Sequence, residues 1–177
     1  MSNILHILVE GDHDGSLVER VIRPWLIERC KYQDVDTFKY ANRKKEIVEN
    51  YIRSISEIGE DLLCLTDYTN APCISGRKED LIDNKIGAFD LAAIIVIVKE
   101  IEGWYLAGAD DRCCRRMGIS YINRTDNIRK QDFHSIISGS KYRTRTACRA
   151  EMLRSFDVML ATARNKSFYR LYHHFLI

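Results

Sequence analysis

The sequence predicts an α/β fold in which a mostly parallel sheet of about four strands carries helices on both faces, giving three α/β/α layers. Three short apolar runs, at residues 3–9, 62–66 and 91–98, have the length and the β-branched content of buried strands. Segments with apolar residues at helical spacing separate these runs. This alternation favours a parallel sheet, because each crossover helix packs back onto a sheet face.

The first predicted helix follows the first strand and covers residues 16–31. Ser16 and Glu19 have the spacing of a capping box, in which each side chain satisfies a backbone N–H at the start of a helix. Apolar residues then recur at helical spacing up to Leu26. Pro24 lies inside this segment and can bend the helix, since proline removes one helical hydrogen bond.

The next two predicted helices end at glycines, which readily adopt the left-handed conformation of a helix terminus. These helices cover residues 43–58, before Gly59, and 77–86, before Gly87. A short strand is expected at residues 36–40.

The pattern changes after Glu100. Residues 101–107 are expected to begin a helix, and residues 108–140 are polar and basic and are expected to be rich in loops. Apolar residues from Ala147 to Ala163 then predict a helix of about 18 residues, and residues 168–176 predict a short last one. We expect one domain over residues 1–177, with a sheet core at 1–107 and a basic loop and C-terminal helical pair at 108–177.

Composition excludes several classes of protein. The chain has 177 residues, of which 46% are hydrophobic and 29% charged, so long disorder is not expected. The longest apolar run, Leu91 to Val98, is far shorter than the roughly 20 residues that span a bilayer, and no signal peptide is visible at the start. Six cysteines without a C-x-x-C pair are typical of reduced thiols. These observations predict a cytoplasmic protein without a membrane partner.

Charge is distributed unevenly along the chain. Residues 1–110 carry 20 acidic and 13 basic side chains, a net charge of −7, whereas residues 111–177 carry 5 acidic and 14 basic, a net charge of +9. A basic segment of this kind can indicate a polyanionic partner, although basic residues also simply solvate helix faces.

Each of the three apolar strands is followed by a carboxylate. Glu10 follows the first, Asp67 the second, and Glu100 with Glu102 the third. Ligands of open parallel sheets bind at the carboxyl ends of the strands, so these side chains are expected to converge. Converging carboxylates repel one another, and a hard divalent cation such as Mg²⁺ or Mn²⁺ relieves the repulsion and stabilises phosphoryl transfer. The alternative is that each carboxylate is a helix cap or a surface charge.

The residues around these carboxylates resemble the motifs of a known family. The hydrophobic strand ending in Glu-Gly looks like the first motif of TOPRIM domains, and two later segments look like the second and third acidic motifs of a small TOPRIM-like family, domain of unknown function 4276. That family is related to the nuclease domain of the overcoming-lysogenization-defect proteins. The matching segments are Ile7-Leu-Val-Glu-Gly-Asp-His-Asp14, Leu65-Thr-Asp-Tyr-Thr-Asn-Ala-Pro72, Val98-Lys-Glu-Ile-Glu-Gly-Trp104, Lys141-Tyr142 and Ser167-Phe168.

The resemblance implies a TOPRIM-like fold and metal-dependent nuclease chemistry. Glu10 matches the glutamate that acts as general acid/base or metal ligand, and Asp67 matches the first aspartate of the Asp-x-Asp pair. The second position of that pair is Thr69, so the metal site is incomplete unless Glu100, Glu102 or Asp14 supplies the missing charge. A TOPRIM-like component of a defence or repair system that binds nucleic acid or protein without catalysis is therefore the alternative.

Four basic residues are candidates for contacting phosphates. Lys99 lies between the third strand and its carboxylates, and three others follow the Gly139-Ser140 loop: Lys141, Arg143 and Arg145. Lysine and arginine in such loops make phosphate contacts that do not depend on base sequence. We therefore expect nucleic acid as a partner.

A second resemblance competes with the first. Asp12-His-Asp-Gly-Ser-Leu17 is similar to the Asp-x-Asp-Gly-Thr-Leu signature of haloacid-dehalogenase-type phosphatases, in which Asp12 would be the nucleophile and Asp14 the acid/base. That nucleophile should follow its strand directly, whereas Glu10 and Gly11 intervene here. The phosphatase is therefore the second alternative.

Overall fold

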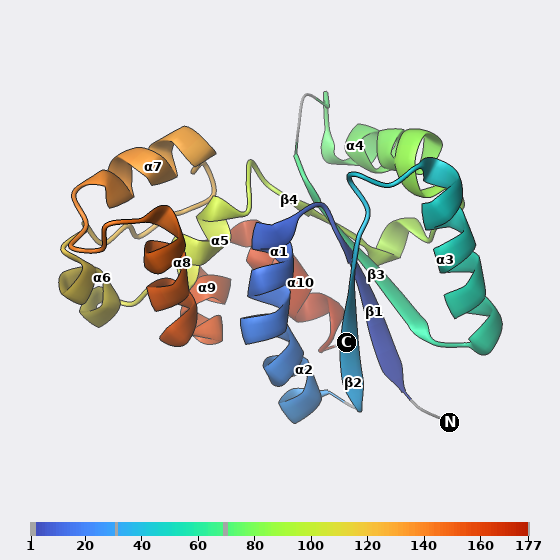
Figure 1. Ribbon diagram of the computed structural model, residues 1–177, viewed down its shortest axis with the longest axis horizontal. Helices are drawn as coiled ribbons and strands as arrows, with labels where there is room; N and C mark the ends of the chain where they lie inside the picture. The colour runs from blue at the N-terminus through green and yellow to red at the C-terminus, as the bar shows by residue number, and fades with distance from the viewer. Residues whose placement is uncertain (1–2, 31, 69–70, 177) are drawn as a thin grey trace. The chain divides into compact units, whose positions relative to one another are not determined.

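The computed structural model describes residues 3–30, 32–68 and 71–176 (Figure 1). The chain forms two compact units, an N-terminal unit (Met1–Val96) and a C-terminal unit (Ile97–Ile177). Each unit is described by itself. The expectation of one domain over residues 1–177 stays a prediction.

A parallel sheet confirms the predicted α/β class. Its strands lie in the order β2-β1-β3-β4, and β1 pairs in parallel with β2 on one side and β3 on the other. The bounds are β1 (Ile4–Val9), β2 (Asp34–Lys39), β3 (Asp61–Asp67) and β4 (Ile94–Ile97). The last strand is shorter than the apolar run predicted, because η3 (Leu91–Ala93) forms a 3₁₀ turn capped by the Asp90 side chain. Glu10 follows β1 and Asp67 is the last residue of β3, so the two residues lie at the ends of adjacent strands.

Helices α1 (Asp12–Leu17) and α2 (Arg23–Arg29) cover one face of the sheet (Figure 1). The helical segment starts at Asp12 rather than Ser16, since the Asp14 side chain accepts the Gly11 N–H and caps the helix start five residues before the predicted capping box. Just before Pro24 the helix widens into one π-helical turn, η1 (Val18–Ile22), which accommodates a residue that cannot donate a hydrogen bond. The predicted last residue, Lys31, lies outside the described residues.

Helices α3 (Lys45–Ile58) and α4 (Ile74–Leu81) cover the other face (Figure 1). As predicted, α3 ends at Gly59, whose φ of 76° is left-handed. The helix expected at residues 77–86 is α4 continued by a π-helical turn, η2 (Ile82–Ile86), and it ends at Gly87 as predicted. The core on this side includes buried apolar residues of strands and helices: Leu8, Val48, Ile52, Cys64, Leu81, Ile86, Ile94 and Val96.

The C-terminal unit is more helical than the sequence predicts. Helix α5 (Glu102–Gly108) is the one expected at residues 101–107. The segment 108–140, expected to be loop-rich, also contains two helices that were not predicted, α6 (Asp111–Met117) and α7 (Lys130–Ser138). Both ends of α6 have sequence signals: Asp110 caps its start, and Gly118, at φ 74°, ends it. These two helices were not predicted, because the polar and basic composition of the region lacks a clear apolar pattern at helical spacing.

The longer of the two predicted C-terminal helices is interrupted. It forms α8 (Arg145–Arg154) and α9 (Val158–Arg164), followed by the last helix, α10 (Lys166–His174). At the break, Phe156 forms a β-bridge with Ala109, and Asp157 caps α9. Gly108 is required beside this break, since a Cβ there would lie 2.4 Å from the Phe156 ring. A long-range contact therefore overrides the local helical pattern.

No helix in the described part of the chain is long and apolar enough to cross a membrane. All six cysteines, each within the described ranges, are thiols rather than disulfides.

Candidate functional site

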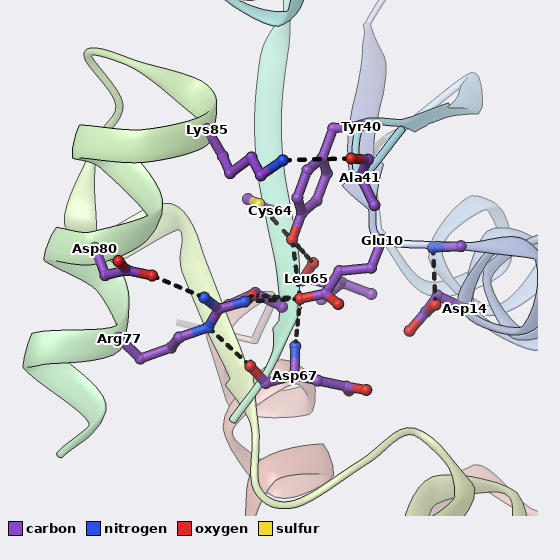
Figure 2. A network of polar contacts seen from close by, with 12 residues as sticks. Glu10, Asp14, Tyr40, Ala41, Cys64, Leu65, Asp67, Arg77, Asp80 and Lys85 are labelled. Carbon is purple, nitrogen blue, oxygen red and sulfur yellow. Dashed lines mark hydrogen bonds and ion pairs between the residues drawn. The ribbon is translucent and has the colours of Figure 1, made fainter. Parts of the chain in front are cut away.

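Glu10, the residue after β1, is the centre of a polar network at the carboxyl end of the sheet (Figure 2). Its Oε1 atom accepts hydrogen bonds from Thr66 Oγ1 at 2.8 Å and from the Asp67 backbone N–H at 3.1 Å. These contacts bring Glu10 and Asp67 together across the adjacent strands β1 and β3, as the order of the strands requires.

Arg77, in the first half of α4, is the basic member of this network. Its Nη2 atom lies 2.9 Å from Glu10 Oε1 and 2.7 Å from Thr66 Oγ1, and its Nε donates to the Asp67 backbone carbonyl at 2.9 Å. A further ion pair joins Nη1 to Asp80 at 3.0 Å. The planar guanidinium therefore fixes both strand ends at once. Arg77 was not among the residues predicted from the sequence, because only the crossover of the chain brings α4 back to the end of β1.

Two neutral groups lie on the inner side of Glu10. The Tyr40 hydroxyl is 3.3 Å from Glu10 Oε1 and 3.3 Å from the Leu65 carbonyl oxygen. Burial, with smaller contributions from Cys64 and Glu10, raises the pKa of Tyr40 far above its usual value. Burial and the nearby Glu10 likewise raise the pKa of the Cys64 thiol. Both groups stay protonated at neutral pH, so Glu10 and Arg77 carry the charges at the centre of this network.

Asp14 lies on the other side of Glu10 from Arg77 (Figure 2). It is buried at 7% exposure, and its Oδ2 accepts the Gly11 N–H at 3.0 Å, which holds the start of α1 next to the end of β1. Glu10, Asp14 and Asp67, three of the predicted metal ligands, therefore belong to one end of the N-terminal unit.

Asp12 has different surroundings. Its side chain is 82% exposed and forms an ion pair with Lys39 Nζ at 2.5 Å. The hydrogen bond and the charge of Lys39 lower the pKa of Asp12. Asp12 is the first residue of α1, and β1 ends at Val9, so the aspartate does not follow its strand directly. The phosphatase stays a prediction to which this arrangement adds no support.

The other two predicted carboxylates are in the C-terminal unit. Glu102 begins α5, is 3% exposed, and accepts a hydrogen bond from Arg149 Nη2 at 2.8 Å. Glu100 accepts the backbone N–H of Lys130 at the start of α7. Each carboxylate thus already has a partner within its own unit, and a catalytic or metal-binding role for Glu100 or Glu102 stays a prediction.

The predicted phosphate-contacting residues are accessible. Lys141, Arg143 and Arg145 are exposed between α7 and the first turn of α8. Lys99 is half-buried and has a φ of 68°, a left-handed conformation that is unusual for a residue with a side chain. Strained backbone of this kind is often found at functional sites.

The donor set of the N-terminal unit fits a hard cation. Mg²⁺ is usually held by one or two carboxylates and keeps several waters, and Glu10 and Asp67 provide such oxygens. The hydrogen bonds that Glu10 accepts from Thr66, the Asp67 backbone and Arg77 all go to its Oε1 atom. Within the described residues no group of three or more His, Cys, Asp or Glu side chains is arranged to hold a metal ion. Thr69, the position at which the second aspartate of the motif is missing, lies outside those residues.

Comparisons with protein-family models, with curated proteins and with solved structures found no match to this chain. The resemblance to the TOPRIM-like family therefore depends on the sequence motifs alone.

Proposed function

We propose that this protein is a metal-dependent, TOPRIM-type nuclease, or a related phosphodiester-transfer enzyme, that acts on nucleic acid in the cytoplasm. The observation that carries the proposal is the meeting of Glu10 and Asp67 at the carboxyl ends of two adjacent parallel strands. The arrangement agrees with the acidic motifs of the sequence.

Glu10 and Asp67, with Asp14 as a further ligand, would hold Mg²⁺ or Mn²⁺. The ion would stabilise the charge that develops on the phosphate oxygens. Arg77 is a positioning residue, since it holds the Glu10 carboxylate and the Asp67 backbone in fixed places. In this proposal Glu10 is the general acid/base or metal ligand. Within the C-terminal unit, the roles of Glu100 and Glu102 as further acidic residues, and of Lys99, Lys141, Arg143 and Arg145 in contacting the phosphate backbone, stay predictions from the sequence.

One observation favours a second function, a non-catalytic TOPRIM-like component that binds nucleic acid or a protein partner. Arg77 already neutralises Glu10 through an ion pair of 2.9 Å, so the carboxylate does not need a metal ion to offset its charge. Such a component would keep the fold and the basic residues without cleaving its ligand.

A cleavage assay separates the two functions. Supercoiled plasmid, single-stranded DNA and RNA are incubated with the protein in Mg²⁺, in Mn²⁺ and in EDTA. We expect metal-dependent cleavage that Glu10→Gln and Asp67→Asn each reduce by at least about 100-fold, as for groups that act in the transition state. Asp12→Asn is the matched control, because it removes a neighbouring carboxylate that has no role in the proposed nuclease, and it should cleave nucleic acid like the wild type.

The outcome decides between the functions. Cleavage that persists in Glu10→Gln and Asp67→Asn contradicts the proposed site. Binding of nucleic acid without cleavage in either metal supports the non-catalytic component. Hydrolysis of small phosphomonoesters that Asp12→Asn abolishes would identify the phosphatase instead.

A further inference from the structure

Four basic side chains of the C-terminal unit come together on α7 and α8, which pack against each other and against α5 (Figure 1). Lys130 and His134 are four residues apart on α7, and Arg145 and Arg149 are four residues apart on α8. Residues at this spacing share one face of a helix. Lys130, Arg145 and Arg149 all act electrostatically on the His134 ring, as does Glu102. We call these four basic residues the α7–α8 basic cluster.

Arg149 is the buried member of the cluster, and neighbouring side chains hold its guanidinium in place. It is 6% exposed, and one of its terminal nitrogens is fixed by Glu102 at 2.8 Å. Its guanidinium carbon also lies 5.0 Å from the centroid of the Phe133 ring and 5.9 Å from that of Tyr105. A guanidinium held on an aromatic face and by a carboxylate is oriented before any ligand arrives.

Two buried nitrogen atoms of the cluster have no hydrogen-bond partner among the described residues. They are Nε of Arg149 and Nε2 of His134. Buried polar atoms are nearly always hydrogen-bonded in folded proteins, so an orphaned pair on packed helices indicates a missing acceptor. The Arg149 Nε–H is always a donor, and His134 Nε2 is a donor in one tautomer and in the protonated ring.

The charge of the surroundings determines the kind of acceptor. The charges that act on the His134 ring are three positive ones, on Lys130, Arg145 and Arg149, and one negative one, on Glu102; with Glu100, which accepts the Lys130 backbone N–H, the positive charges still outnumber the negative ones, so an anion is attracted and a metal cation is repelled. Lys130 and Arg145 are exposed, whereas Arg149 is buried, so the cluster combines accessible positive charges with one enclosed guanidinium. A phosphate group offers several acceptor oxygens to donors arranged in this way.

We propose that the α7–α8 basic cluster is a phosphate-binding subsite. The buried nitrogen atoms of Arg149 and His134 donate hydrogen bonds to the phosphate oxygens, and the exposed side chains of Lys130 and Arg145 bind the phosphate through their positive charges. The phosphate belongs to a nucleic acid or is free in solution. Arg145 was expected from the sequence to contact phosphate, and the structure adds three residues to it. The subsite does not depend on cleavage at Glu10 and Asp67.

The test is a titration of the full chain with inorganic phosphate, at constant ionic strength, followed by the NMR signals of the five histidine rings. We expect a saturable shift of the His134 signal, assigned by its loss in His134→Gln, and no comparable shift with chloride. Arg145→Ala should weaken phosphate binding by about tenfold or more, the loss expected for one charge-assisted hydrogen bond.

Arg170→Ala is the matched control, because Arg170 is also an exposed arginine of the C-terminal unit but lies on α10. It removes the same charge and should change the phosphate affinity by less than about twofold. Equal losses in Arg145→Ala and Arg170→Ala would indicate only a general charge effect and would overturn the subsite. A His134 signal that does not move in phosphate would overturn it as well.

A competition experiment with a DNA oligonucleotide identifies the source of the phosphate. A short DNA oligonucleotide that displaces inorganic phosphate and shifts His134 at lower concentration shows that the subsite takes nucleic-acid phosphates. If inorganic phosphate binds but the oligonucleotide neither displaces it nor shifts the His134 signal, the subsite takes free phosphate. Loss of cleavage in Glu10→Gln with unchanged phosphate binding would separate this site from the proposed catalytic one.

Discussion

Two of the glutamate–arginine pairs of this protein, one in each unit, differ in their exposure to water. Glu10 and Arg77 are 2.9 Å apart with side chains 26% and 12% exposed, whereas Glu102 and Arg149 are 2.8 Å apart and only 4% and 7% exposed. The first pair is shared with Thr66 and the backbone of Asp67 and remains within reach of a ligand. The second is enclosed between α5 and α8.

Two ion pairs of similar length can therefore differ in how much the protein loses when one partner is removed. An enclosed pair contributes little net stability, but the loss of one partner leaves a buried charge without compensation. A partly exposed pair loses less when it is broken, since water replaces the missing partner. We therefore expect the Glu102–Arg149 pair to matter most for folding and the Glu10–Arg77 pair to matter most for the site.

The largest expected effect on stability is that of Arg149→Met. It leaves Glu102 buried without its guanidinium partner, and the free energy of unfolding should fall by about 3–5 kcal/mol in urea titrations. The double variant Glu102→Leu with Arg149→Met removes both charges and should recover most of that loss. A loss below about 1 kcal/mol in the single variant would show that this pair behaves like a surface one.

Arg77→Met should destabilise the chain less, by about 1–3 kcal/mol, because it removes hydrogen bonds to Glu10, Thr66 and the Asp67 carbonyl at a partly exposed position. Cleavage by the proposed nuclease should also fall, because Arg77 holds the Glu10 carboxylate in place, and Arg77→Lys should restore the charge but not the bridging geometry. Arg53→Met is the control, since Arg53 is exposed on α3 and makes one long contact, to Asn50 at 3.4 Å. Similar losses in the two methionine variants would contradict the role given to Arg77.

Glu151 extends the comparison to a carboxylate with several partners. Burial alone would raise its pKa, but the hydrogen bonds from Arg116 and Tyr142 and the charge of Arg154 outweigh burial and lower the pKa below 4.5. A depressed folded-state pKa stabilises the protein above the unfolded value, and this contribution is lost as the pH falls through the lower folded value.

Wild-type stability should therefore drop as the pH decreases below about 4.5, and Glu151→Gln should flatten this part of the profile. Unfolding midpoints measured between about pH 3 and pH 7 provide the measurement. A drop of equal steepness in the variant would show that other carboxylates cause it.

The smallest expected effect is that of Asp12→Asn, which breaks the exposed ion pair with Lys39. Solvent screens this pair, so the thermal midpoint should equal that of the wild type within experimental error. A clear shift of the midpoint would mean that exposure is a poor guide to the importance of ion pairs in this chain.

Local signals predicted most of the N-terminal unit. The apolar strands and the glycines at 59 and 87 are properties of short segments, and the structure has them where they were expected. The break of the C-terminal helix at Phe156 was not predictable in the same way, because it follows from contacts with Gly108 and Ala109 nearly 50 positions earlier in the sequence. Helix α6 could have been found, since Asp110 and Gly118 are ordinary end signals.

The sequence by itself determined the parallel α/β architecture and the placement of Glu10 and Asp67 at strand ends, because periodicity and strand length are local. Only the tertiary structure decided which charges are paired. Arg77 reaches Glu10 across 67 positions, and Arg149 reaches Glu102 across 47. Pairing at such separations depends on how helices return to the sheet or to one another, which no local pattern encodes.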